Sequence, residues 1–181
     1  MRKLPISEIG RLSPEEYKQI SKLDLIVVLD NIRSHHNTGA IFRTCDAFGC
    51  QAVFLCGITG TPPHRDIHKT ALGATETVDW EYYESAIDVA KTLKSEGYII
   101  IVLEIAEGSI NISDFTPSPT QRYALFLGNE VNGVQQEILD ICDYCIEIPQ
   151  YGTKHSLNVS VSGGIAIWEI CKKIRLQQKS L

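Results

Sequence analysis

Three short segments of this 181-residue sequence combine glycine with polar side chains that could hold a ligand or take part in acid–base chemistry. Glycine permits tight turns and lets the backbone approach a ligand closely. Amide, hydroxyl, carboxylate and guanidinium groups supply hydrogen-bond donors and acceptors. The polar side chains are Asn37 and Arg43 in residues 30–44, Glu130 in residues 127–134, and Ser156 and Asn158 in residues 148–160.

Each segment also has a simpler interpretation when it is taken alone. Asn37 can cap the helix that follows it, which leaves Arg43 as an ordinary surface side chain. The turn at Gly128 resembles a common strand-to-helix connection, and its spacing and lack of Lys match neither the dinucleotide-binding glycine motif nor the P-loop. A plain N-cap requires only one of Ser156 and Asn158, so the presence of both favours a binding site.

The elements that must position these segments follow from the apolar pattern. Continuous branched apolar runs of strand length are typical of strands covered on both faces. They lie at residues 25–29, 52–56, 98–103, 123–127 and 145–148, with a weaker candidate at 77–82. Helical patterns lie at residues 38–48, 67–72, 85–95, 134–141 and 159–174, and Ser13-Pro14 followed by two acids opens a short helix at about 13–22.

Regular alternation of strand and helix with short connections indicates right-handed crossovers. The sequence therefore predicts an α/β fold with a mainly parallel six-stranded sheet and helices on both faces. In such sheets ligands bind beyond the carboxyl ends of the strands. We expect the loops after Leu29, Leu103, Leu127 and Ile148 to form a site there.

Length and composition fit one domain over residues 1–181, because 44% hydrophobic residues can bury a substantial core. No apolar run approaches the roughly 20 residues that span a bilayer, and the first residues lack the apolar core of a secretion signal. We therefore expect a cytoplasmic protein without a membrane partner.

A net charge of −5 argues against bulk electrostatic binding of nucleic acid. Two local clusters soften that argument: Arg33, His35, His36 and Arg43, and His64, Arg65, His68 and Lys69.

Six cysteines lie among apolar neighbours, which favours reduced thiols in the core over disulfides. Cys142 and Cys145 have the C-x-x-C spacing of a redox or metal site. Because no second pair exists, we predict no metal site.

In this order and at these strand ends, the three segments resemble the signature motifs of the SpoU (TrmH-like) branch of the SPOUT methyltransferases. The resemblance runs over residues 25–174. It implies a deep trefoil knot near the C-terminus, an exception to the rule that chains are unknotted. It also implies a homodimer with a shared active site, which uses S-adenosylmethionine to methylate ribose 2′-hydroxyls of RNA. Small size favours tRNA as the substrate, and rRNA remains possible.

The resemblance carries over to individual residues. Arg43 resembles the catalytic arginine and Asn37 the asparagine that helps to place it, while Glu130 matches the acid of the second motif. Ser156 and Asn158 match the polar pair of the third. The expected cofactor contacts are Leu103, Glu104, Leu127, Gly128, Ile148, Pro149, Ser156 and Leu157. The apolar C-terminal helix suits a dimer face or an ordinary core helix, through Val161, Ile165, Trp168 and Ile174.

Methyl transfer from a sulfonium is an in-line displacement, so positioning of the ribose oxygen dominates the chemistry. The hydroxyl is a weak nucleophile until its proton is removed or its oxygen is polarised. A guanidinium normally stays protonated, which leaves two roles for Arg43. It acts as the base after contacts with the RNA phosphate and the dimer partner, or it stays charged and orients phosphate and hydroxyl.

Two other functions fit the same pattern. One is an ordinary nucleotide-dependent α/β enzyme, which the missing dinucleotide glycines disfavour. The other is a non-catalytic RNA-binding module of the same fold. Because only about 24 residues precede the first predicted strand, we expect the catalytic domain or a partner to select the RNA.

Overall fold

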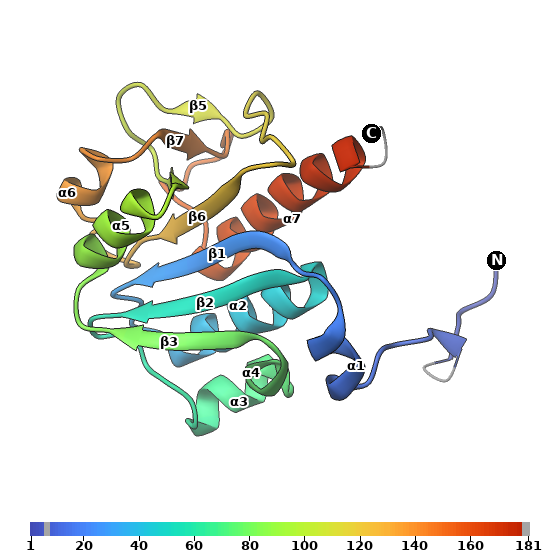
Figure 1. The fold of residues 1–181 in the computed structure, drawn as a ribbon. Helices are drawn as coiled ribbons and strands as arrows, with labels where there is room; N and C mark the ends of the chain where they lie inside the picture. Colours follow the sequence, from blue (N-terminus) through green and yellow to red (C-terminus); the bar gives the residue numbers. More distant parts are fainter. Residues whose placement is uncertain (6–7, 179–181) are drawn as a thin grey trace.

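A computed structural model describes residues 1–5 and 8–178, and its centre is a seven-stranded sheet (Figure 1). The strand order is β3-β2-β1-β6-β4-β7-β5, and every strand pair is parallel. All carboxyl ends therefore meet at one edge of the sheet. The strands are β1 Leu23–Asp30, β2 Cys50–Cys56, β3 Asp79–Tyr83, β4 Tyr98–Leu103, β5 Ile110–Asn111, β6 Arg122–Leu127 and β7 Tyr144–Glu147.

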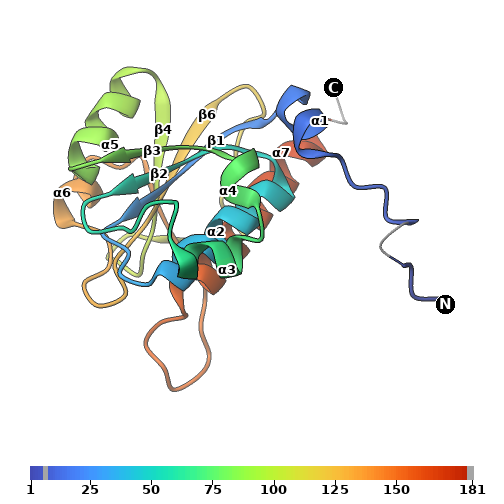
Figure 2. The same cartoon turned by 90° about the horizontal axis from the view of Figure 1, so that it is seen from below.

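Helices cover both faces of the sheet, as predicted (Figures 1 and 2). Helices α5 and α6 lie on one face, and the remaining helices lie on the other. The helices are α1 Pro14–Gln19, α2 His35–Phe48, α3 Arg65–Ala71, α4 Ala74–Thr77, α5 Ala86–Ser95, α6 Gln136–Leu139 and α7 Val159–Gln178.

The burial of β1 explains why its sequence reads as a continuous apolar run. Successive side chains of a strand point to opposite faces of the sheet. Leu25, Val27 and Leu29 pack in the core on the α2 and α7 side. Ile26 and Val28 pack in the second core, beneath α5 and α6. Both faces of this inner strand are covered, so no polar residue interrupts the run between Leu25 and Leu29.

The prediction of six strands is one too low. Strand β5 consists of two residues, Ile110 and Asn111, and pairs with β7 at the edge of the sheet. A strand this short has no recognisable pattern in the sequence. Helix α1 has the expected capping box between Ser13 and Glu16, but it ends at Gln19 rather than Lys22, since β1 already begins at Leu23.

Helix α2 begins three residues earlier than predicted. Ser34 is its N-cap, and the Ser34 hydroxyl accepts a hydrogen bond from the backbone N–H of Asn37 at 3.3 Å. The prediction that Asn37 caps this helix is therefore wrong. Asn37 lies inside the first turn instead, and its side chain bonds Glu130 and Asn158.

The C-terminal helix α7 has two different faces. Ile174 is 4% exposed and lies in the core with Ile167 and Ile170, so it cannot belong to a dimer face. Val161, Ile165 and Trp168 are exposed and follow one another at helical spacing. These three form an uncovered apolar stripe.

All six cysteines are free; four are buried, while Cys142 and Cys145 are half-buried. Both still pack against the core beneath α5 and α6, so the interpretation of the cysteines as core side chains holds fully for the four buried ones and in part for this pair. Within the described residues, no helix is both long and apolar enough to cross a membrane.

Candidate active site

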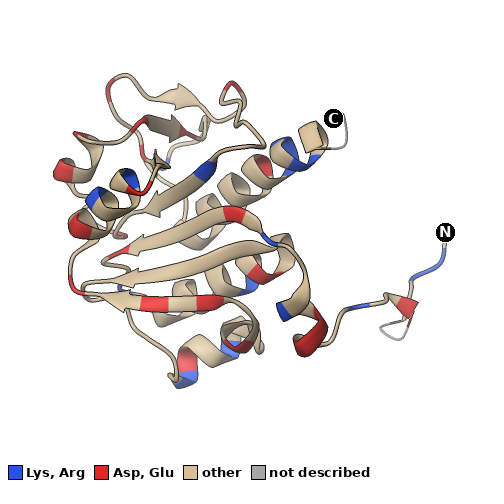
Figure 3. Cartoon of the chain, in the orientation of Figure 1, with Lys and Arg blue, Asp and Glu red and all other residues tan. Residues whose placement is uncertain are grey.

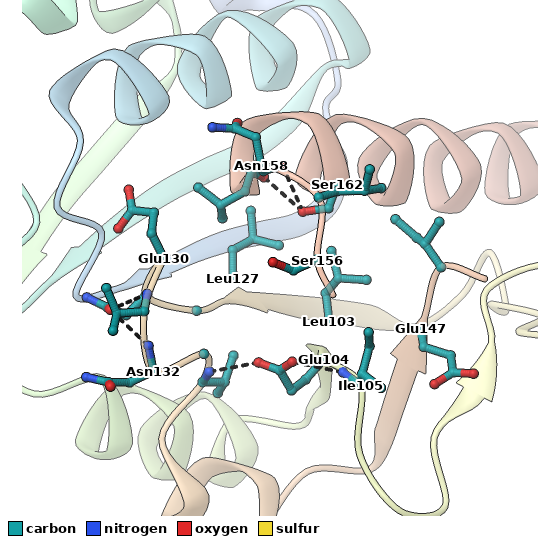
Figure 4. Close-up of a pocket in the computed structure, with 18 of the residues that line it drawn as sticks. Leu103, Glu104, Ile105, Leu127, Glu130, Asn132, Glu147, Ser156, Asn158 and Ser162 are labelled. Atoms are coloured by element: carbon teal, nitrogen blue, oxygen red, sulfur yellow. Dashed lines mark hydrogen bonds between the residues drawn. The ribbon is translucent and has the colours of Figure 1, made fainter. Parts of the chain in front are cut away.

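A cavity of about 640 Å³ opens at the carboxyl ends of β4, β6 and β7 (Figure 4). Its walls come from the loops after these strands and from the first turn of α7. The lining residues are Leu103, Glu104, Ile105, Leu127 to Val134, Gln136, Leu139, Glu147, Ile148, Gln150, Ser156 to Val159, and Ser162. Its volume lies in the range of pockets that hold small molecules and cofactors.

The cavity exists because the loop after β6 folds back on itself. Backbone hydrogen bonds join Asn129 and Gly133 in both directions, at 2.9 and 3.0 Å. A Cβ on Gly128 would lie 2.2 Å from the backbone nitrogen of Val134, so only glycine permits this close approach. The sequence signal at Gly128 therefore reflects packing within the loop as well as access to the cavity.

Glu104 joins two of the loops. Its carboxylate accepts hydrogen bonds from the backbone N–H of Ile105 at 2.9 Å and from that of Val134 at 3.2 Å. The bond to Val134 ties the end of β4 to the loop after β6, while the bond to Ile105 fixes the carboxylate against its own loop (Figure 4). This wall of the cavity is thus held by hydrogen bonds to a carboxylate, which are stronger than hydrogen bonds between two neutral groups.

A second network connects the three predicted motifs. The Glu130 carboxylate accepts from the backbone N–H groups of Arg33 at 2.9 Å and Ser34 at 3.1 Å, and from the Asn37 side-chain amide at 3.0 Å. The Asn37 carbonyl accepts from the Asn158 side-chain amide at 3.2 Å. Three loops that are far apart in sequence are therefore joined by Glu130, Asn37 and Asn158.

This network also affects the charge of Glu130. Partial burial acts to raise the pKa of its carboxyl group. Hydrogen bonds from the backbone of Arg33, Glu130 and Ser34 and from the Asn37 side chain outweigh burial and lower the pKa. Glu130 is therefore ionised at neutral pH, and its charge is used to hold the loops together.

Arg43 lies apart from these groups. It is exposed on α2 and does not line the cavity. Within residues 1–5 and 8–178 it makes no hydrogen bond or ion pair. The structure therefore does not bring Arg43 to the cavity of its own chain, although it brings together the other predicted site residues except Pro149.

Comparison with known proteins matches residues 24–168 to the SpoU rRNA methylase family. The chain belongs to the SpoU family. The matched residues include all but the first residue of β1, the whole of α2, the cavity loops and the first half of α7, so they cover every segment that forms the site.

Relatives of this SpoU chain include two bacterial enzymes. One is a tRNA (guanosine(18)-2′-O)-methyltransferase of Aquifex aeolicus, 36% identical over 148 residues, which cover 81% of this chain and 68% of that protein. The other is the 23S rRNA (guanosine-2′-O-)-methyltransferase RlmB of Neisseria meningitidis, 32% identical over 84% of this chain and 60% of that protein. The chain spans 55–69% of the length of four such curated relatives.

Solved structures resemble this SpoU fold closely. The crystal structure of the A. aeolicus TrmH/SpoU tRNA modifying enzyme superposes with a TM-score of 0.81 at 31% identity, covering 91% of this chain and 82% of that one. An AdoMet-bound rRNA methyltransferase from Sinorhizobium meliloti gives 0.77 at 25% identity, covering 92% and 61%.

Seven of the eight residues expected at the cofactor line the cavity, and Pro149 does not. Of the residues expected in catalysis, Glu130, Ser156 and Asn158 line it, while Asn37 reaches it through Glu130 and Asn158. Their roles in binding and catalysis stay predictions.

Sequence reasoning missed several lining residues. Ile105, Glu147 and Ser162 line the cavity and lie outside the recognised motif positions. Ser162 could have been found, because it follows Asn158 by one helical turn, and its hydroxyl donates to the Asn158 backbone carbonyl at 3.3 Å. Glu147 and Ile105 carry no such signal, since their place depends on how β4 and β7 pair.

Proposed function

We propose that this chain transfers a methyl group from S-adenosylmethionine to a ribose 2′-hydroxyl of tRNA or rRNA. The observation that carries the proposal is the cavity lined by the second and third motif loops, to which Asn37 of the first is joined through Glu130 and Asn158. The same proposal treats residues 25–174 as one catalytic unit and places the protein in the cytoplasm, since tRNA and ribosomal RNA are its candidate substrates.

The lining chemistry fits this cofactor. Glu104, Glu130 and Glu147 contribute carboxylates, and no Lys, Arg or His is among the lining residues, all of which lie in the described chain. A negative cavity favours a ligand with a sulfonium and an ammonium group and disfavours the phosphates of a dinucleotide. Leu103, Leu127 and Ile148 are positioned to enclose an adenine ring.

Bound S-adenosylmethionine supplies an electrophilic methyl group. The residues of the chain then have two tasks, which are to hold the ribose oxygen in line with that methyl carbon and to exclude water. Ser156 and Asn158, at the start of α7, are placed to hydrogen-bond the incoming ribose or the cofactor. Asn37 and Glu130 position this loop rather than act on the reacting atoms.

The place of Arg43 supports a homodimer with a shared site. An exposed arginine that is absent from its own cavity can contribute to catalysis if a second copy brings it to the partner's cavity. The apolar stripe Val161, Ile165 and Trp168 on α7, which packs beside α2, gives that second copy a surface to bury. Arg43 then contacts the RNA phosphate and ribose at the partner's cavity.

The proposal includes the trefoil knot that the family resemblance implies. Strand β7 lies toward one edge of the sheet, whereas α7 packs under its centre, with Gly163 against Leu127 of β6. The chain between β7 and α7 must therefore cross the cavity loops. Shortening that crossing by deleting residues 151–154 is expected to abolish cofactor binding, measured by calorimetry.

Methyl transfer to RNA tests the function directly. Purified protein, tritiated S-adenosylmethionine and total RNA from a strain lacking this gene should give labelled RNA with 2′-O-methylribose after hydrolysis.

Arg43→Ala should lower kcat/KM by about 100-fold or more, because the group that stabilises the reacting centre is lost. Arg43→Lys retains the charge but loses the guanidinium fork, and near-normal methylation by it would contradict both proposed roles of Arg43.

The rival functions give different results in the same experiment. A nucleotide-dependent enzyme would be stabilised by NAD rather than by S-adenosylmethionine in thermal-shift titrations. A non-catalytic RNA-binding module would bind RNA without incorporating label. Mapping the modified nucleotide by primer extension at low dNTP concentration then identifies the RNA.

A further inference from the structure

Two basic segments that are separate in sequence form one surface in the fold. His35, at the start of α2, stacks on His64, just before α3, with ring centroids 3.8 Å apart and an angle of 9° between the rings. The exposed side chains around this stack are Arg33, His36, Arg65, His68 and Lys69. We call the stack and these five residues the histidine patch.

The stack is built into the backbone around it. A Cβ on Gly60 would lie 2.2 Å from the His35 ring, so the loop after β2 packs directly against that ring. The Thr70 hydroxyl donates to the backbone carbonyl of His36 at 3.0 Å, which ties α3 to the start of α2. His64 is exposed while His35 is half-buried, so the pair has a supported ring and an outer ring.

Besides stacking on His35, the His64 side chain caps helix α3, and this contact fixes the orientation of its ring. Its Nδ1 accepts a hydrogen bond from the backbone N–H of Asp66 at 3.2 Å and caps α3. This bond uses the lone pair of Nδ1 and leaves Nε2–H as the ring's donor. The ring is therefore held in place as a flat aromatic surface with one polar edge.

The charge of the patch opposes that of the whole protein. Residues 31–44 and 57–70 contain four Lys or Arg and a single acid, Asp66, although the chain carries −5 overall. Lys69 pairs with Asp66 at 2.9 Å, whereas the two arginines of the histidine patch, Arg33 and Arg65, have no ion pair inside the described chain. A second basic group lies on α7 (Figure 3), but Lys172 and Lys173 pair with Glu169, and the Arg175 guanidinium donates to the Phe48 backbone carbonyl. The arginines of the histidine patch are therefore better placed to bind phosphates.

The patch lies beside the proposed active site. The loops after β1 and β2 carry Arg33 and His64, and parallel strands place them at the same edge as the cavity loops. The backbone N–H of Arg33 also binds the Glu130 carboxylate, whose side chain lines the cavity. An RNA strand that enters the cavity edge therefore meets the patch with the nucleotides next to the methylated one.

We propose that the histidine patch binds the RNA next to the target nucleotide, with an unpaired base stacked on His64 and neighbouring phosphates on Arg33 and Arg65. The inference rests on the proposed function and names where its substrate binds. Histidine rings stack on unpaired bases in many RNA-binding proteins, and arginines hold the backbone. A duplex offers no free base face, so the patch selects RNA with an unpaired nucleotide.

Variants of His64 separate the ring from the cap. His64→Asn removes the ring and keeps an N-cap side chain, because asparagine is a preferred N-cap residue. His64→Phe keeps an aromatic face and loses the cap. Binding is measured by fluorescence anisotropy with two fluorescein-labelled probes of equal length, an RNA stem-loop with unpaired bases and a blunt RNA duplex.

Stacking predicts a defined pattern. His64→Asn should weaken binding of the stem-loop about 10-fold and leave the duplex unchanged, whereas His64→Phe should stay within about 2-fold of the wild type. Arg65→Ala should weaken both probes and reduce the slope of log affinity against log salt by about 1. Lys91→Ala, an exposed lysine on α5 at the opposite face, is the matched charge control and should change neither.

Equal stem-loop binding by wild type and His64→Asn would overturn the proposal, as would a loss as large in Lys91→Ala as in Arg65→Ala. Unchanged RNA affinity in all patch variants would assign the surface to another kind of partner. Failure of the proposed function looks different, since the wild type would then neither bind S-adenosylmethionine nor label RNA. Failure of the patch alone leaves methylation intact, with the same KM for RNA in every patch variant.

Discussion

Asn37 and Glu130 show how the site depends on single polar groups. Glu130 is an acid in a negatively charged cavity, yet its carboxylate is directed at backbone N–H groups of the β1–α2 loop. Asn37 is 9% exposed and uses both ends of its amide, one toward Glu130 and one toward Asn158. Loss of Glu130 leaves the amide of the buried Asn37 without its acceptor, and an unpaired buried donor costs more than a broken surface hydrogen bond.

Glu130→Gln should destabilise the protein in a pH-dependent way. An amide presents one acceptor where the carboxylate presents two, so we expect the free energy of unfolding at pH 7 to fall by about 1–2 kcal/mol. The pKa of Glu130 is lowered in the fold, so its contribution is complete above the unfolded value near 4.5 and is lost as pH falls through the lower folded value. Urea denaturation at pH 7, 5 and 3.5 measures the difference.

The gap between wild type and Glu130→Gln should therefore close below about pH 4.5. Glu137→Gln is the control, because Glu137 is exposed on α6, and its change should stay within about 0.5 kcal/mol at every pH. A gap that is constant from pH 7 to 3.5 would show that Glu130 does not act through its charge.

At the scale of elements, helix α2 is the centre of the arrangement. It packs on the sheet, on α3 and on α7, and it carries Asn37 at one end and Arg43 farther along. Gly39 lets α3 approach closely, since a Cβ there would lie 2.3 Å from the Ile67 backbone oxygen. The spacing of α2 and α3 in turn places His35 against His64.

Gly39→Ala should destabilise the fold by about 1–3 kcal/mol through overpacking, despite the better helix propensity of alanine. Gly164→Ala on α7 is the matched control, because nothing lies within 4 Å of its added methyl group, and it should be neutral or stabilising by up to about 1 kcal/mol. Chemical denaturation measures both. Equal stability of Gly39→Ala and wild type would mean that α3 is loosely packed.

At the scale of the whole molecule, the exposed stripe on α7 and the remote Arg43 favour a dimer. Trp168 is 50% exposed and contacts the Phe48 ring of α2, with centroids 5.3 Å apart. Trp168→Glu places a charge in the surface that a second copy would bury, so sedimentation velocity should show a monomer without methyltransferase activity. Leu72→Glu, at another exposed apolar position, should stay dimeric and active. A monomeric wild type would contradict the dimer.

Mixing two inactive variants tests whether the site is shared. An Arg43→Ala chain retains its cavity, and an Asn158→Ala chain retains Arg43. After unfolding and refolding together at equal amounts, about a quarter of wild-type activity should return, because half of the dimers carry one complete site. Activity no greater than the sum of the separate variants would place Arg43 and its cavity in the same chain.

The apolar pattern of the sequence was sufficient to predict the parallel α/β architecture. Strand β4 has the predicted bounds, and the other long strands lie within two residues of theirs, because a strand buried on both faces leaves an uninterrupted apolar run. The loops at Gly128 and Ser156 could be located for the same reason, since they directly follow such runs. The strand ends thus identified most of the cavity.

Contacts between distant residues lay outside that pattern. Ser34 rather than Asn37 caps α2, β5 exists through its pairing with β7, and His35 meets His64 because Gly39 brings α2 and α3 together. Arg43 faces away from its own cavity because α2 buries its other side on the sheet. Periodicity specifies which face of an element is apolar, but the neighbour that each polar side chain meets depends on how the elements pack.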